Sequence, residues 1–202
     1  MLIAVRFGPG AGVSADEMGT KMSRRRVVLC ALALALSWAV LATSPGWADV
    51  GGDKATLQRD KATLQHIRQL SGRYHSIKQA KRAGYVADMV CVSAPGLGGM
   101  GYHYVNGPLI DKTLDIDHPE ILLFASKPGG RHRLTGVEYV VVDADQNLAT
   151  SGDRPVLAGH PFDGPMPGHF PGMPIHYDLH VWAWAHNPMG SFATWNPAIT
   201  CP

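Results

Sequence analysis

The chain has 202 residues, of which 17% are charged, and a formal net charge of +2 at pH 7. Five basic and two acidic side chains lie within residues 1–48, so the rest of the chain is close to neutral and we expect no nucleic-acid partner. About 150 residues remain beyond this segment, which is enough for one domain with a hydrophobic core.

Residues 23–48 have the pattern of a secretory signal peptide. A basic cluster at Arg24–Arg26 precedes an apolar run over Val27–Leu41, and small residues precede Asp49. The apolar run is too short to span a membrane. The sequence therefore predicts a signal peptide over residues 1–48 and an exported protein, periplasmic or extracellular, with no membrane span after cleavage.

Two details of this signal stay open. Residues 23–29 are also similar to a twin-arginine export signal, although we favour the plain basic region of the general pathway. Residues 1–21 have no pattern of their own, so Met18 and Met22 are alternative starts to Met1.

Two of the three cysteines lie beyond the signal peptide. Cys30 would be removed with the signal, which leaves Cys91 and Cys201. A disulfide between these two is the expected state in an oxidising compartment. Two free thiols or two metal ligands are the weaker alternative, because neither cysteine has the CxxC or CxxH spacing of a metal site.

The region after the signal peptide has a helical pattern. A seven-residue repeat, DKATLQR followed by DKATLQH, places Leu57 and Leu64 one heptad apart. This spacing predicts an amphipathic helix over residues 49–72. A second helix is predicted over residues 73–83, where Gly84 would end it as a C-cap does.

From Tyr85 onward, β-branched and aromatic runs are separated by Gly and Pro, as in short strands. Residues 143–174 form a long Gly/Pro-rich loop, of the kind that serves as a lid, a binding loop or a disordered segment. We therefore predict an α+β fold, with an antiparallel β meander or a small partly closed barrel over residues 73–202. The predicted strands are residues 85–92, 99–106, 121–125, 132–142 and 175–186, with a hairpin turn at Lys127–Gly130.

The segment MPIHYDLHVWAWAHNP, residues 173–188, has the pattern of a strand with one polar and one apolar face. Its odd-numbered residues form an ordinary core face, whereas the even-numbered face carries donors, acceptors and rings, as a pocket does. A helix ranks second, because Pro174 precedes the segment and the Glu of an HExxH zinc helix is absent. The even-numbered face consists of His176, Asp178, His180, Trp182, Trp184 and His186.

A metal site at this face would need ligands from neighbouring strands. Strand residues four apart have Cα atoms about 13 Å apart, so His176 and His180 are not expected to chelate one ion as a pair. His103 in GMGYHYVN and Glu138 in VEYVVV are the candidate partners, and the carboxylate lies in apolar company. One interpretation of this face is therefore a copper or zinc site with His103, Glu138, Asp178 and His180 as candidate ligands. His160 and His169 lie in the loop that could close over it.

The same face supports three other interpretations. A small organic ligand would stack on its rings, and the candidate residues are His176, Trp182, Trp184, Tyr102 and Tyr104. A metal-dependent enzyme would use Asp178 to orient a histidine, but no nucleophile elbow, P-loop or dinucleotide motif indicates a reaction. In a purely structural interpretation, His103, Glu138 and Asp178 only satisfy one another inside an exported domain.

The motifs GMGYHYVN, DIDHPEILLF, VEYVVV, HYDLHVWAWAHNPMGSF and WNPAITC follow one another along the chain. Through them the chain resembles a family of small secreted bacterial proteins of uncharacterised activity, over residues 74–202. Gly107 before Pro108 is a small departure from the family pattern, in a turn. The resemblance implies secretion and a shared core of motif residues, and it implies no substrate.

Overall fold

The computed structural model describes residues 50–202, and the predicted signal peptide lies outside them. The helical segments are α1 (Val50–Ser71), the 3-10 helix η1 (Gly72–His75), α2 (Ile77–Arg82) and the 3-10 helix η2 (Gly107–Leu109). The strands are β1 (Val86–Ala94), β2 (Gly98–Val105), β3 (Ile121–Lys127), β4 (Arg131–Val142), β5 (Val156–Leu157), β6 (His160–Pro161), β7 (Asp163–Met166) and β8 (His176–Val181).

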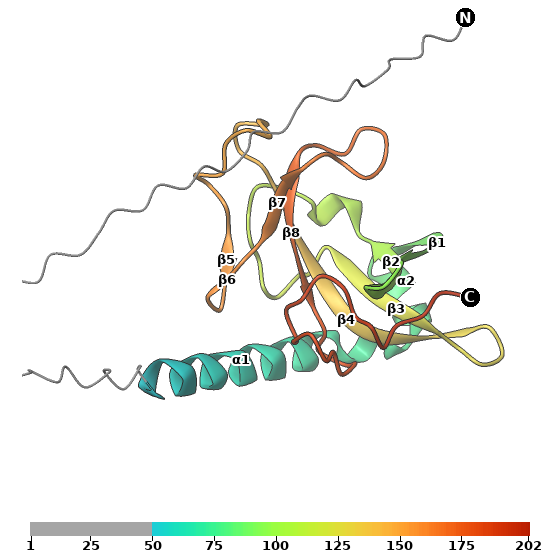
Figure 1. Cartoon of the computed structure of the whole chain (residues 1–202). Helices are drawn as coiled ribbons and strands as arrows, with labels where there is room; N and C mark the ends of the chain where they lie inside the picture. Colours follow the sequence, from blue (N-terminus) through green and yellow to red (C-terminus); the bar gives the residue numbers. More distant parts are fainter. Residues whose placement is uncertain (1–49) are drawn as a thin grey trace, which may run out of the picture. The chain divides into compact units, whose positions relative to one another are not determined.

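Six of these strands form one antiparallel sheet, in the order β1-β2-β3-β4-β8-β7 (Figure 1). β5 and β6 pair separately as a short ribbon. The predicted hairpin between β3 and β4 is confirmed, because Lys127 pairs with Arg131. The α+β class is also confirmed. The partly closed barrel is wrong, since β1 and β7 are the two edges of an open sheet.

One face of the sheet packs against the helices. Ile67 of α1, Tyr74 of η1 and Ala80 of α2 are buried in one cluster with Val137 and Tyr139 of β4. Full burial of a large apolar side chain contributes about 1.5–3 kcal/mol, so this cluster, the larger of the two described, anchors the helices to the sheet.

The predicted second helix exists in two pieces. The backbone is extended at Ser76, which separates η1 from α2. Gly84, with φ of +98°, follows α2 in the left-handed conformation that the C-cap prediction requires.

The C-terminal segment covers the opposite face of the sheet. Ile199 packs there in a second cluster with Ile121 and Leu123 of β3. Backbone hydrogen bonds between Gly99 and Asn196, with N···O distances of 3.1 and 3.2 Å, hold the segment beside β2. The disulfide between Cys91 and Cys201 fastens its end to β1, which confirms the predicted pairing.

β8 is shorter than the strand predicted over residues 175–186. After Val181, the amide of Trp182 donates to the carbonyl of Ser191 at 2.8 Å and no longer to a neighbouring strand. The chain therefore leaves the sheet at this point. The prediction that the even-numbered face extends to His186 is wrong, because that side chain is exposed beyond the end of the strand.

The Gly/Pro-rich loop predicted at residues 143–174 contains three short strands. β5 and β6 form its ribbon, and β7 adds to the large sheet as an edge strand, with Asp163 opposite Asp178. The loop is therefore partly built into the sheet. Its last part, residues 167–175, returns the chain from β7 to β8.

We expect Cys91→Ser and Cys201→Ser to lower the free energy of unfolding by equal amounts. The bond closes a loop with a sequence separation of 110, and losing such a bond costs about 2–5 kcal/mol. Urea unfolding of the oxidised protein and the two variants measures this effect. The double variant should be no less stable than either single one. Recovery of both cysteines as free thiols from exported protein would contradict the pairing.

Candidate functional site

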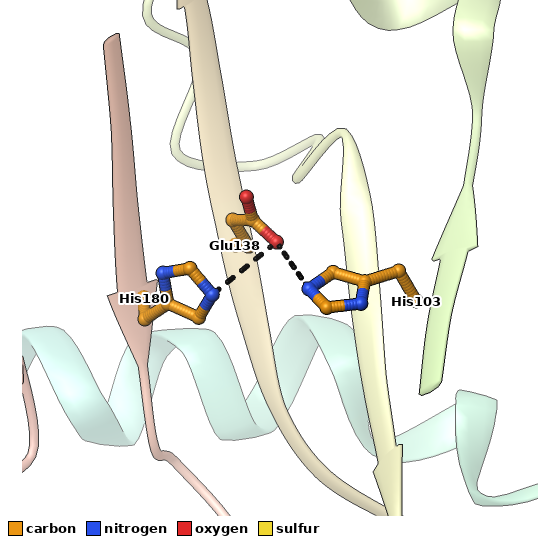
Figure 2. Close-up of side chains that lie close together, drawn as sticks. All are labelled: His103, Glu138 and His180. Atoms are coloured by element: carbon orange, nitrogen blue, oxygen red, sulfur yellow. Dashed lines mark ion pairs between the residues drawn. The ribbon is translucent and has the colours of Figure 1, made fainter. Parts of the chain in front are cut away.

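Three strands bring His103, Glu138 and His180 together on the face covered by the C-terminal segment (Figure 2). Glu138 of β4 pairs directly with His180 of β8, so the two side chains leave the sheet side by side. His103 reaches them from β2 across β3, where its backbone partner is Leu123. The predicted juxtaposition of these three residues is therefore found in the structure.

The two imidazoles converge on one oxygen of the carboxylate. Glu138 Oε2 lies 3.3 Å from His103 Nε2 and 3.6 Å from His180 Nε2 (Figure 2). Both distances exceed the usual hydrogen-bond range of about 2.7–3.2 Å. Two ligand atoms bound about 2.0–2.1 Å from a tetrahedral ion lie about 3.3–3.4 Å apart. The 3.3 Å spacing matches the edge of a metal coordination shell, and the 3.6 Å spacing is slightly longer than that edge.

The atoms of this group are buried and lack partners. Within the part of the chain that the structure describes, Glu138 Oε2 and both ring nitrogens of His180 accept or donate no hydrogen bond. Only His103 is partly open, with 13% of its side chain exposed. A buried polar atom without a partner costs about 1–3 kcal/mol, so Glu138 Oε2 and His180 Nε2, which face each other, need a compensating interaction.

Electrostatics favours the metal-binding protonation states of Glu138 and His180, but not that of His103. Burial opposes ionisation of Glu138, but the facing imidazoles of His180 and His103 outweigh it and hold the pKa of this carboxyl well below its usual range. Burial lowers the pKa of His180 and exceeds the opposing attraction of Glu138. His103 differs, because the contact with Glu138 overcomes burial and raises its pKa. A carboxylate therefore faces one neutral imidazole and one more basic imidazole that an ion would have to deprotonate.

A second group lies next to the first on the same face. His176 and Asp178, both buried on β8, approach His169, which is exposed in the loop between β7 and β8. The rings of His169 and His176 meet edge to face, with centroids 4.8 Å apart. The predicted ligand set thus divides, and Asp178 belongs with His176 and not with Glu138.

Asp178 also faces the first group. Its Oδ1 lies 3.8 Å from His180 Nδ1, which is too long for the orienting hydrogen bond that an enzyme interpretation requires. Burial, and next the negative charges of Glu138 and Asp163, raise the pKa of Asp178 to about 8. Of Glu138 and Asp178, the carboxyl of Asp178 is therefore the less readily ionised.

The predicted aromatic lining is found only at Trp182. This ring is buried beside His180, with centroids 6.4 Å apart, and its indole N–H donates to the carbonyl of Ala193. Trp184 lies on the helix side, where its indole N–H donates to Ser71 Oγ at 3.0 Å.

Tyr102 and Tyr104 also lie on the helix-covered face, opposite His103. Tyr102 stacks on His132, with ring centroids 4.3 Å apart, and Tyr104 packs on Phe124. The expectation that the tyrosines and Trp184 share one pocket with His180 is therefore wrong.

Of the two loop histidines, only His169 reaches the site. His160 Nε2 lies 2.9 Å from Asp60 Oδ1 of α1 instead. Sequence reasoning missed Glu120, whose buried carboxylate accepts the amide of Val140 at 2.9 Å beside Glu138. Burial raises the pKa of Glu120 to about 8. Its place directly before the apolar run ILLFA was the available signal.

Comparison with protein-family models, with curated proteins and with solved structures gives no match to this chain. Among residues 50–202, no helix has the length and apolar character that crossing a membrane requires. The function is therefore argued from the geometry and chemistry of the site.

The raised pKa of Asp178 predicts that the metal-free protein loses stability as pH rises. The unfolded chain ionises this group near pH 4, whereas the fold retains the proton up to about pH 8. Between these two pH values unfolding releases one proton, so the free energy of unfolding falls by about 1.4 kcal/mol for each pH unit of increase. Glu120 and His103, whose pKa values are also raised, act in the same direction.

Urea unfolding of chelator-treated protein between about pH 7 and 8, above the ordinary histidine pKa of about 6.5, measures this slope. We expect Asp178→Asn to reduce the slope by about one proton, while Asp145→Asn, at an exposed carboxyl whose hydrogen bonds go to Asn147 and Thr150, leaves it unchanged. An Asp178→Asn slope equal to that of the wild type would show that the native group is already ionised.

Proposed function

We propose that this protein is exported and binds a transition-metal ion, copper or zinc, through His103, Glu138 and His180. The observation that carries the proposal is the convergence of three ligand atoms, all within 4.8 Å of one another, two of them buried without hydrogen bonds. An ion at their centre would satisfy all of them at once. Two imidazoles and a carboxylate are donors that suit zinc and copper.

A purely structural role explains less of the geometry. A protonated His103 would pair with Glu138 Oε2 at 3.3 Å, and this contact needs no ion. His180 would gain nothing, because its two ring nitrogens lie 3.6 and 3.8 Å from the nearest carboxylate oxygens. Burying an imidazole with neither nitrogen bonded is unfavourable, and coordination removes that cost.

Binding of a small organic ligand is also less well supported. Three of the rings expected to stack on such a ligand lie on the helix-covered face. A surface pocket of about 530 Å³ lies between α1 and the loop at residues 189–193, and it is lined by other side chains, including Leu57, Leu64 and Phe192. We therefore propose ion binding and assign no reaction.

Export to the periplasm or the medium is part of the same proposal. A disulfide of large loop length agrees with folding in an oxidising compartment, and residues 1–48 have the pattern of a signal peptide. The family resemblance is a separate argument for secretion. Mass determination of the exported chain would test it, with cleavage expected before Asp49.

Metal affinity of site variants tests the proposed ligands. We expect His103→Ala, Glu138→Gln and His180→Gln each to weaken Zn²⁺ or Cu²⁺ binding at least tenfold, which corresponds to about 1.4 kcal/mol. Competition with a chromogenic chelator measures the affinity, and circular dichroism confirms that each variant folds. His118→Ala is the matched control, because this exposed histidine pairs with Asp115 and lies outside both groups. Wild-type affinity in all three variants would refute the site.

A further inference from the structure

The second group, His169, His176 and Asp178, has the features of a built site. His176 is fully buried and Asp178 is 3% exposed. Within the described residues, His176 Nε2 and Asp178 Oδ1 have no hydrogen-bond partner. The three ligand atoms of the group all lie within 4.8 Å of one another. Two independent observations, convergence and the lack of partners, therefore point to a ligand at this place.

The orientation of His176 is already fixed for coordination. Its Nδ1 lies 3.2 Å from the carbonyl of Pro174, which can only accept, so Nδ1 carries the hydrogen. Nε2 then holds a free lone pair directed at the group. Metal-binding histidines usually donate their other ring N–H to a carbonyl or carboxylate in this way, which sets the tautomer.

The loop that carries His169 is held in place by its own bonds. The amide of His169 donates to Met173 Sδ at 3.4 Å, and the amide of Met173 donates to the carbonyl of Phe170 at 3.1 Å. Met173 also packs against the cluster beneath the C-terminal segment. The exposed imidazole is therefore positioned over the two buried ligands, on the solvent side of the group.

His180 stands between the two groups. Its Nε2 faces Glu138 at 3.6 Å and its Nδ1 faces Asp178 at 3.8 Å. Each nitrogen is thus directed at the carboxylate of a different group, and neither makes a hydrogen bond within the described part of the chain. One imidazole with two such neighbours can serve one ion on each side.

We propose that His169, His176 and Asp178 bind a second divalent transition-metal ion, and that the imidazole of His180 lies between the two ions with one nitrogen directed at each. The sharing of His180 rests on the proposed function, whereas the second ion alone does not. The neutral imidazole has one N–H proton, which the second ion displaces into solvent.

The charges agree with two ions. Glu138 and Asp178 are both buried, and the ion-pair contacts described for them involve histidines alone. One divalent ion at the first group leaves the buried Asp178 carboxyl without a cation. A second ion would displace the proton of this carboxyl into solvent and pair its own positive charge with the carboxylate at short range.

Metal stoichiometry tests the second ion. The mature exported protein, treated with chelator, is dialysed against Zn²⁺ and analysed for zinc per chain. We expect two ions in the wild type and in the control His118→Ala, and one ion in His176→Ala and in His103→Ala. Where His176→Ala fails to fold, Asp178→Asn replaces it, because it preserves the shape of the side chain.

The outcomes separate this inference from the proposed function. One zinc in the wild type that His103→Ala removes and His176→Ala retains overturns the second site and leaves the first. One zinc that only His176→Ala removes overturns the first site and leaves the second. Absence of bound zinc, together with absence of bound copper when Cu²⁺ replaces Zn²⁺ in the dialysis, overturns both.

Electron paramagnetic resonance of the Cu²⁺-loaded protein tests the shared imidazole. Two copper ions on one imidazole are magnetically coupled, so the signal of the wild type should fall well below that of two isolated ions. His176→Ala, with one ion, should give the full signal of one isolated copper. Two independent copper signals in the wild type would overturn the sharing of His180.

Discussion

The register between β4 and β8 determines where the other groups of the site lie. Because Glu138 is opposite His180, Val140 is opposite Asp178 and Val142 is opposite His176. A slip of one residue would turn every ligand on β8 to the helix-covered face. The backbones of β4 and β8 lie close together at Gly136, where an added Cβ would lie 2.4 Å from the carbonyl oxygen of Val181. The close approach of the two backbones at this glycine leaves no space for a side chain.

The sheet separates apolar packing from the polar groups. Odd-numbered residues of β8 join the core beneath the helices, and the apolar surface area buried in this core stabilises the domain. The other face can therefore carry four buried ionisable groups without the loss of the core: Glu138, His176, Asp178 and His180. Trp182 and Ile199 cover part of this face and keep water away, which strengthens electrostatic interactions among the ligands.

Strand alternation predicted the part of the site that lies on regular backbone. His103, Glu138 and His180 are all within strands, so period-two reasoning placed them on the correct face. The same reasoning failed at Trp184, because tertiary hydrogen bonds to Thr135 replace the ladder there. Sequence spacing also gave no way to divide four ligands into two groups. That division depends on the contact of His169, in the loop between β7 and β8, with His176 and Asp178. This is a tertiary contact, and the local sequence gives no signal for it.

The ligands of the first group come from β2, β4 and β8, strands separated by long stretches of sequence. Such a site does not exist in the unfolded chain, and local folding of any hairpin does not create it. An ion at the proposed site would therefore act late, after long-range strand pairing, and would stabilise the finished sheet without nucleating it. If the chain were exported unfolded, such an ion would come from the destination compartment, whereas a chain exported after folding would carry an ion from the cytoplasm. Under the proposed function, the export route would thus select the metal pool that supplies the site.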